Sequence, residues 1–185
     1  MKLIKLGLIG FGTVGSAIYT VLNRNREEIK SRLGHDFQLS LICIRSKEKA
    51  ALFADSSVRV CLDPLEVINS DVDVVIEVIG GTGCAKSFIE KSLKNKKHVV
   101  TANKELIALH GRKLFKIAKD NEVMLLYEAA VAGGIPIIKT LREGLSANQI
   151  TLVAGIINGT TNYILTEMQK SRSNYKDILK LAIKK

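Results

Sequence analysis

The chain has 185 residues, enough for one full domain and part of a second. Hydrophobic residues make up 46% and charged residues 25%, a globular balance that excludes a disordered or fibrous protein. Three scattered cysteines without a CxxC pair argue against a zinc site and favour a reducing cytoplasm. No stretch has the pattern of a signal peptide or of a membrane-spanning helix.

The charge balance is basic, with 28 Lys and Arg against 18 acids and a formal net charge of +10. The basic residues are mostly scattered lysines, no Arg-rich block occurs, and there is no Trp to stack bases. A plain basic surface is therefore favoured over a nucleic-acid footprint. A small anionic ligand such as a dinucleotide fits the charge equally well. We expect neither nucleic acid nor a membrane as a partner.

Short apolar or β-branched runs alternate with amphipathic stretches along the first 130 residues. The stripe formed by Val14, Ala17, Ile18, Val21 and Leu22 predicts the first helix, closed by the charged residues 24–30. Strands are expected at 3–9, 37–44, 72–79, 98–100 and 122–127, and further helices at 84–93 and 102–119. This alternation predicts an α/β fold, a Rossmann-like, doubly wound and mostly parallel sheet.

The pattern changes after about residue 130. A helix is expected at 135–145, a strand at 150–157, another helix opening near Asn158, and a last helix at 175–185. One strand and a few helices cannot enclose a core. We therefore predict a cofactor-binding domain at 1–130 and, at 131–185, the incomplete beginning of an α+β substrate domain.

A glycine-rich turn, Gly10-Phe11-Gly12-Thr13-Val14-Gly15, stands between the first strand and the first helix. In the dinucleotide fingerprint Gly10 permits the tight turn, Gly12 lets the backbone approach the pyrophosphate, and Gly15 lets helix and strand pack closely. The helix start at Thr13 and Val14 then offers free N–H groups to the phosphates. The alternative, a simple strand-to-helix turn, needs one glycine rather than three.

The end of the second strand bears on the choice between NAD and NADP. An NAD-preferring site places an acid there to hold the ribose 2′-hydroxyl, but Asp36 lies before the strand, at the wrong end. Arg45 and Lys47 follow the strand and would attract a 2′-phosphate, which favours NADP. An ordinary solvated basic loop is the alternative, and the two readings weigh nearly evenly.

Two further loops follow strands and so belong to the edge of the sheet where ligands bind. Gly80 and Gly81 follow the strand at 72–79 and would let the backbone pass close to the nicotinamide ribose. Thr101 and Lys104 follow the strand at 98–100, where a lysine could bind substrate and move a proton. A solvated surface lysine is the equally weighted alternative for Lys104.

Four motifs in order resemble homoserine dehydrogenase: the glycine-rich turn, the TANK segment ending at Lys104, the segment at 127–136 that contains Glu128, and the NGTTNYIL segment that begins at Asn158. The resemblance covers essentially the whole chain. It implies NAD(P)-dependent interconversion of L-homoserine and L-aspartate 4-semialdehyde, on the route to threonine, methionine and isoleucine.

The resemblance also implies roles for particular residues. Lys104 would contact cofactor and substrate as the catalytic lysine, and Asn158, Gly159 and Thr160 would lie near the substrate. A monovalent cation such as Na⁺ would be held by the Glu128 carboxylate and three carbonyls, those of Val131, Gly133 and Ile135. Without the resemblance, this last stretch is a glycine-rich bend with a helix start.

The family's acidic substrate-binding stretch and second lysine have no counterpart in these residues, so we expect weak turnover or none from this chain alone. A homodimer is expected, both from the family and from the free edge of the strand at 150–157. One alternative is an inactive NADP-binding remnant or regulatory module. Another is a semialdehyde dehydrogenase with a cysteine nucleophile, for which Cys84 is the only cysteine near the ligand edge.

Overall fold

The computed structural model describes residues 3–51, 53, 55–156 and 159–184. The chain divides into two compact units, Met1–Leu141 and Arg142–Lys185. Among the described residues, no helix combines the length and the apolar character of a membrane span.

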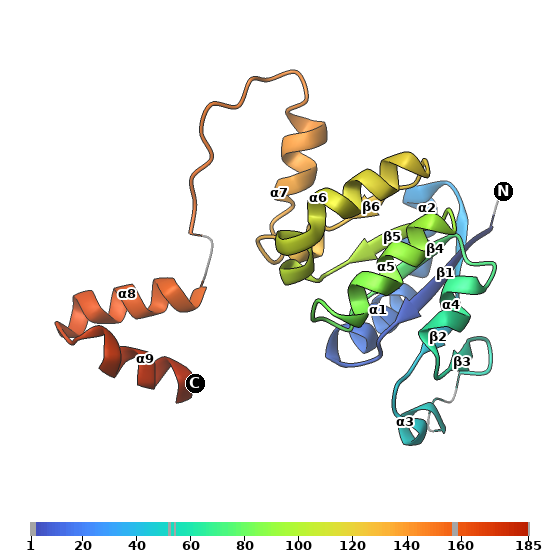
Figure 1. Cartoon of the computed structure of the whole chain (residues 1–185), viewed down its shortest axis with the longest axis horizontal. Coiled ribbons are helices and arrows are strands. Elements are labelled where there is room, and N and C mark those ends of the chain that lie inside the picture. The colour runs from blue at the N-terminus through green and yellow to red at the C-terminus, as the bar shows by residue number, and fades with distance from the viewer. Residues whose placement is uncertain (1–2, 52, 54, 157–158, 185) are drawn as a thin grey trace. The chain divides into compact units, whose positions relative to one another are not determined.

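The first unit is built on a six-stranded sheet in the order β3-β2-β1-β4-β5-β6, and all its strand pairs are parallel (Figure 1). The strands are β1 (Leu3–Ile9), β2 (Asp36–Cys43), β3 (Arg59–Cys61), β4 (Val74–Glu77), β5 (His98–Thr101) and β6 (Leu125–Leu126). The first three strands are added toward one edge of the sheet, and the next three are added from β1 toward the other edge. The point between β1 and β4 where this order switches is where doubly wound folds bind nucleotides. The predicted fold class is confirmed.

Helices cover both faces of this sheet (Figure 1). One apolar core lies under α4 (Pro64–Asn69), α5 (Cys84–Lys94) and α6 (Lys104–Asp120). A second core lies under α1 (Thr13–Arg24) on the other face. The remaining elements of the unit are α2 (Arg26–Leu33), α3 (Lys47–Ala51), the 3₁₀ turn η1 (Glu128–Ala130), α7 (Ile137–Lys139) and the π-helical η2 (Thr140–Gly144), which continues to the unit boundary and beyond.

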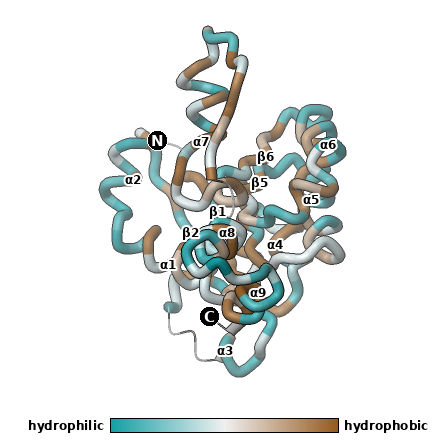
Figure 2. Tube along the Cα trace, turned by 90° about the vertical axis from the view of Figure 1, so that its left-hand side faces the viewer, coloured by the Kyte–Doolittle hydropathy of each residue, from teal (hydrophilic) through white to brown (hydrophobic). Residues whose placement is uncertain are grey.

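Local sequence explains where the observed elements differ from the expected ones. The first helix does not continue through residue 30, because the chain bends at Asn25 and α2 begins as a separate helix that ends at Gly34 in a left-handed conformation (φ +67°). In Figure 2 α2 is coloured hydrophilic over most of its length, and it buries no residue. The short elements α3, β3 and α4 were not predicted, because each is too short to show a periodic pattern.

The second unit contains α8 (Gly159–Ser171) and α9 (Tyr175–Lys184), as expected. The two helices pack against each other, and each buries one isoleucine, Ile164 and Ile178. The strand predicted at 150–157 is wrong for its described part, because residues 150–156 form no strand and pair with no other strand of the described chain. An apolar run becomes a strand only when another strand satisfies its backbone. Ile157 lies outside the described residues.

Candidate cofactor site

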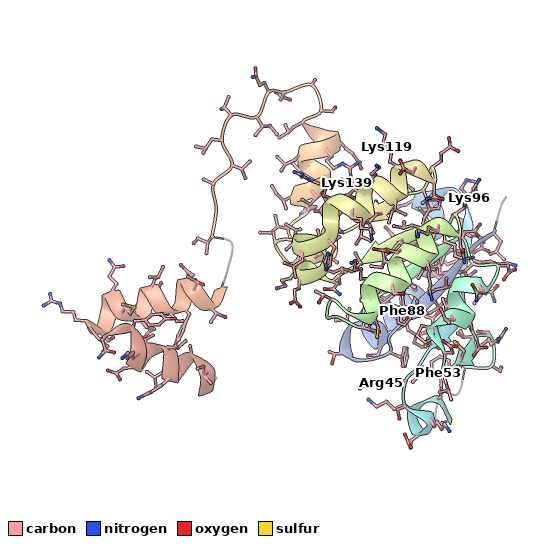
Figure 3. The ribbon with its side chains drawn as sticks, viewed as in Figure 1. Arg45, Phe53, Phe88, Lys96, Lys119 and Lys139 are labelled. Atoms are coloured by element: carbon pink, nitrogen blue, oxygen red, sulfur yellow. The ribbon has the colours of Figure 1, made fainter. Side chains whose placement is uncertain are left out.

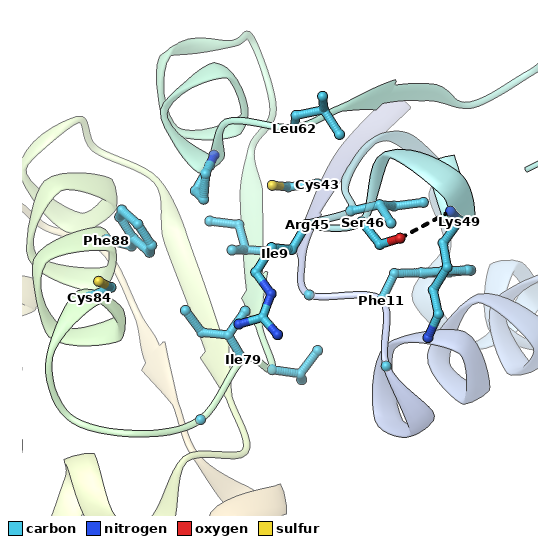
Figure 4. Close-up of a pocket in the computed structure, with 16 residues that line it drawn as sticks. Ile9, Phe11, Cys43, Arg45, Ser46, Lys49, Leu62, Ile79, Cys84 and Phe88 are labelled. Carbon is cyan, nitrogen blue, oxygen red and sulfur yellow. Dashed lines mark hydrogen bonds between the residues drawn. The ribbon is translucent and has the colours of Figure 1, made fainter. Parts of the chain in front are cut away.

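A cavity of about 660 Å³ opens at the carboxyl ends of β1, β2 and β4 (Figure 4). Four of the predicted cofactor-binding residues line it: Gly10, Gly12, Arg45 and Gly80. Its walls also include Phe11, Ser46, Lys49, Cys84 and Phe88, which the sequence did not single out as cofactor ligands. The cavity therefore lies at the predicted edge of the sheet and within the size range of small-molecule sites.

Two of the three fingerprint glycines are required by packing. Gly10 has φ +106°, and a Cβ there would lie 2.8 Å from Cγ2 of Ile79. Gly15 is buried, and a Cβ on it would lie 2.1 Å from the carbonyl oxygen of Gly10. Any side chain at Gly15 would thus push α1 away from β1.

The third fingerprint glycine, Gly12, is not required by packing. A Cβ on Gly12 would meet no protein atom within 4 Å, and its φ of −88° suits any residue. Gly12 is also the N-cap of α1 and supplies no side-chain cap, while Thr13 and Val14 in the first turn are exposed. This leaves an uncapped helix N-terminus beside an open space, which is the arrangement that binds phosphate.

Basic residues from the segment after β2 line the cavity (Figure 4), and one of them, Arg45, is also labelled in Figure 3. Arg45 lines the cavity, together with Lys49 from α3. Lys47 is exposed and is not among the lining residues. The short helix α3 explains this exchange, because Ser46 Oγ accepts a hydrogen bond from the Lys49 backbone N–H (3.2 Å) and starts a turn that separates the two lysines.

The acid that the sequence placed at the wrong end of the second strand has a structural role. Asp36 begins β2, and its carboxylate contacts Arg26 (2.6 Å) and Lys30 (3.3 Å). The Phe37 backbone N–H, aided by these two cations, holds the pKa of Asp36 below its usual value. The first acid after β2 is Glu48, which lies in α3 and accepts a hydrogen bond from the Ser46 hydroxyl.

An aromatic cluster supports the wall formed by Phe11. The rings of Phe11, Tyr19 and Phe53 meet edge to face, with centroids 5.3 to 6.1 Å apart. Tyr19 donates a hydrogen bond to Asp55 (2.6 Å), and this raises the pKa of Tyr19. These contacts hold the segment after α3 against α1 and so help to position the basic lining residues, Arg45 and Lys49.

On the other side of the cavity, a buried carboxylate organises the loop after β4. Glu77 has no exposed surface. Its Oε1 accepts hydrogen bonds from the backbone N–H groups of Ile79 (2.8 Å) and Gly80 (3.2 Å). Sequence reasoning missed this residue, although a single acid inside the run Val74-Val75-Ile76-Glu77-Val78-Ile79 was a visible signal.

The same carboxylate connects this loop to the TANK segment. Thr101 Oγ1 lies 2.6 Å from Glu77 Oε2 and accepts from the Asn103 backbone N–H (3.0 Å). Asn103 caps α6 through Leu106 N (3.1 Å) and donates to the Gly81 carbonyl (2.6 Å). Gly81 and Thr101 therefore belong to one hydrogen-bonded network with Glu77 and Asn103, but neither of them lines the cavity, and Thr101 is fully buried. Lys104 begins α6 and is exposed.

Glu128 lies in η1, beyond the last strand of the sheet. Both of its carboxylate oxygens accept backbone N–H groups at the start of α7, from Ile138 and Lys139 (2.9 Å each). This cap explains why residues 131–141 cluster with the first unit. The intervening turn contains two left-handed residues, Ala132 (φ +54°) and Gly133 (φ +60°).

The ligand set predicted for a cation is therefore partly engaged. The Ile135 carbonyl accepts from Ile137 N (2.8 Å), whereas the carbonyls of Val131 and Gly133 accept no hydrogen bond from the described residues. The described residues also contain no group of three or more His, Cys, Asp or Glu side chains placed to hold a metal ion.

Three residues were expected near a substrate. Asn158 lies outside the described residues, while Gly159 and Thr160 are exposed at the start of α8 in the second unit. Cys84, the candidate nucleophile of the alternative reading, begins α5 and lines the cavity. No hydrogen bond to its thiol occurs among the described residues, so the structure adds no observation in favour of a cysteine nucleophile.

Comparison with known proteins identifies the family of this chain. The family model for the NAD-binding domain of homoserine dehydrogenase matches residues 10–128, and the homoserine dehydrogenase model matches residues 136–185. The chain belongs to the homoserine dehydrogenase family. The recognition made from the four motifs is thus confirmed.

Individual relatives agree with this assignment. Homoserine dehydrogenase from Neisseria gonorrhoeae is 51% identical over 183 residues, which is 98% of this chain and 42% of the relative. The crystal structure of a homoserine dehydrogenase from Thiobacillus denitrificans is 46% identical and superposes with a TM-score of 0.87, over 98% of this chain and 42% of that one. A hyperthermophilic archaeal homoserine dehydrogenase in complex with NADPH is 25% identical, with a TM-score of 0.79, over 98% of this chain and 60% of that one. The chain thus spans about 42% of the length of the first two relatives.

Proposed function

We propose that this chain is the NADP-binding part of a homoserine dehydrogenase. The observation that carries the proposal is the space at Gly12, where a Cβ would meet nothing, beside the uncapped N-terminus of α1. A turn that served packing alone would need glycine at positions 10 and 15 but not at 12. The residues present therefore fit a dinucleotide pyrophosphate at this turn.

The two halves of the sheet supply the two halves of the dinucleotide site. On the side of β2, Arg45 and Lys49 are placed to attract a 2′-phosphate, which supports NADP over NAD. On the side of β4 and β5, the Gly80–Gly81 loop would face the nicotinamide ribose, and Thr101, which is fully buried, would support this loop through Glu77. Lys47 is less well placed than Lys49, since it is not among the residues that line the cavity.

The reaction that we propose for the whole enzyme is the interconversion of L-homoserine and L-aspartate 4-semialdehyde. When bound, the nicotinamide supplies the hydride chemistry. Lys104, exposed at the start of α6, would hold a proton at Nζ near the substrate hydroxyl. Asn158, Gly159 and Thr160 would shape the substrate site.

Such an enzyme belongs to threonine, methionine and isoleucine biosynthesis. We propose that it is a cytoplasmic homodimer. We also propose that the cofactor-binding domain ends at residue 130 and the substrate domain begins at residue 131.

A monovalent cation at the turn after η1 is part of the same proposal. An ionised carboxylate has about four lone-pair sites, and the α7 cap uses two of those on Glu128. The carbonyls of Val131 and Gly133 accept no hydrogen bond from the described residues. Oxygen-only ligands suit a hard ion such as Na⁺.

The test is a titration of the chain with NADP⁺ and NAD⁺, followed by a homoserine oxidation assay. Tighter binding of NADP⁺ than of NAD⁺ supports the cofactor assignment, and binding of neither overturns it. Homoserine-dependent reduction of NADP⁺ would support the dehydrogenase. Binding with weak turnover or none is the outcome expected of this chain alone, which spans about 42% of the relatives' length.

A further inference from the structure

Glu77 is a charged residue at the centre of the sheet. It is the last residue of β4, it pairs with Ile9 of β1 and Thr101 of β5, and it has no exposed surface. A buried carboxylate costs free energy unless hydrogen bonds or a counter-ion compensate it. Among the described residues, no ion pair includes Glu77. Hydrogen bonds alone therefore hold this residue.

The directions of these hydrogen bonds match an ionised carboxylate at Glu77. The backbone N–H groups of Ile79 and Gly80 can only donate to Oε1. Thr101 Oγ1 already accepts from Asn103 N, so its own proton is free to point at Oε2. All partners thus donate toward the carboxylate, and none requires it to carry a proton.

This anion lies directly behind the loop that the proposed function gives to the nicotinamide. Ile79 and Gly80, which it holds, line the cavity. Gly80 (φ +74°) and Gly81 (φ +71°) have no protein atom within 4 Å of an added Cβ. The oxidised nicotinamide ring carries a positive charge and the reduced ring is neutral. A nearby buried anion therefore interacts more favourably with the oxidised form.

We propose that Glu77 is a positioning residue for the Gly80–Gly81 loop and that its buried charge strengthens the binding of NADP⁺ relative to NADPH. This inference rests on the proposed function, because it requires the nicotinamide to lie on this side of the cavity. It differs from a purely structural role, which would strengthen both oxidation states equally. The ratio of the two dissociation constants distinguishes the two roles.

The experiment is a titration of the unchanged chain and of Glu77→Gln with NADP⁺ and with NADPH. Glutamine keeps the size of the side chain and removes its charge. We expect the ratio Kd(NADP⁺)/Kd(NADPH) to rise roughly tenfold in Glu77→Gln, the effect of unit charges about 12 Å apart at an effective dielectric constant of about 20. An unchanged ratio in a folded variant overturns the inference but leaves the proposed function intact. Failure of the unchanged chain to bind either cofactor overturns the proposed function itself.

Thr101→Val is the second variant, and it keeps the inference testable if Glu77→Gln does not fold. Valine has nearly the shape of threonine and removes the hydroxyl beside Glu77 while leaving the carboxylate charge in place. It should loosen the loop and weaken both cofactors by a similar factor, so that the ratio stays within about twofold of the unchanged chain. A tenfold shift of the ratio in Thr101→Val would overturn the charge as the cause. Circular dichroism melts of all three proteins show which of them are folded.

Discussion

The fingerprint glycines allow a test in which the same kind of substitution has opposite consequences. At Gly12 a valine would meet no protein atom near its Cβ, and φ of −88° suits it. The cost to stability is limited to a poorer N-cap, at most about 1 kcal/mol. The valine methyl groups would occupy the space in front of the α1 N-terminus that we assign to the pyrophosphate. We expect NADP⁺ binding to weaken at least about a hundredfold, or about 2.7 kcal/mol.

Gly15→Ala is the matched control, because it should affect the fold first. Its added Cβ would lie 2.1 Å from the Gly10 carbonyl oxygen, a contact that backbone movement must relieve. Overpacking of this kind costs about 3 kcal/mol. For a chain of this size, that should lower Tm by about 9 °C.

Thermal melts and NADP⁺ titrations of the two variants separate these effects. The expected pattern is a stable Gly12→Val that does not bind and a destabilised Gly15→Ala. A folded Gly12→Val that binds NADP⁺ as tightly as the unchanged chain would show that the phosphates lie elsewhere. A Gly15→Ala protein with an unchanged Tm would refute the packing argument.

Three further predictions concern charged residues. Arg45→Asp should reverse the preference for NADP⁺ over NAD⁺ in paired titrations, whereas Lys47→Asp, at an exposed position off the cavity, should change it little. The pKa of Asp36 is lowered in the folded chain, chiefly by the Phe37 N–H. The ionised carboxylate therefore stabilises the fold above the usual aspartate pKa, and this stabilisation is lost as the pH falls through the folded pKa. Acid unfolding of Asp36→Asn should accordingly depend less on pH below about 4. Glu128→Gln should lower Tm and abolish any stabilisation by Na⁺. If no cation binds, Na⁺ should not stabilise the unchanged chain either.

The sequence predicted the parts of the fold that repeat a long pattern. The β-branched run before Gly80 required burial, and the apolar stripe after Gly12 required a helix, although only Ile18 and Leu22 of this stripe pack against the second core. The alternation of such segments left few topologies. The glycines of the turn were also predicted from the sequence, because their spacing is typical of a backbone that must turn tightly and approach a ligand. The structure adds which requirement each glycine meets, since only contacts in space separate Gly12 from Gly15.

What the sequence did not predict depends on contacts between distant segments. Glu77 and Thr101 are 24 residues apart in the chain, and only the pairing of β4 with β5 brings them together. Lys49 lines the cavity and Lys47 does not, because the residues after Arg45 form a helix of five residues rather than an extended loop. The strand expected at 150–157 failed in its described part for a related reason, since an apolar run says nothing about whether a partner strand is present.

Glu128 caps α7 and is also the proposed carboxylate ligand of a cation, and its substitution by glutamine separates these two roles. Its two oxygens accept from Ile138 N and Lys139 N, so glutamine would keep one acceptor and turn an N–H₂ group toward the other donor. The lost cap should cost about 1 kcal/mol, or about 3 °C in Tm, in any salt. A bound Na⁺ would add a second effect, a higher Tm of the unchanged chain in NaCl than in choline chloride of equal concentration. An equal Tm in the two salts would refute the cation and leave the cap standing. A Glu128→Gln protein as stable as the unchanged chain in choline chloride would refute the cap and its role in holding residues 131–141 to the first unit.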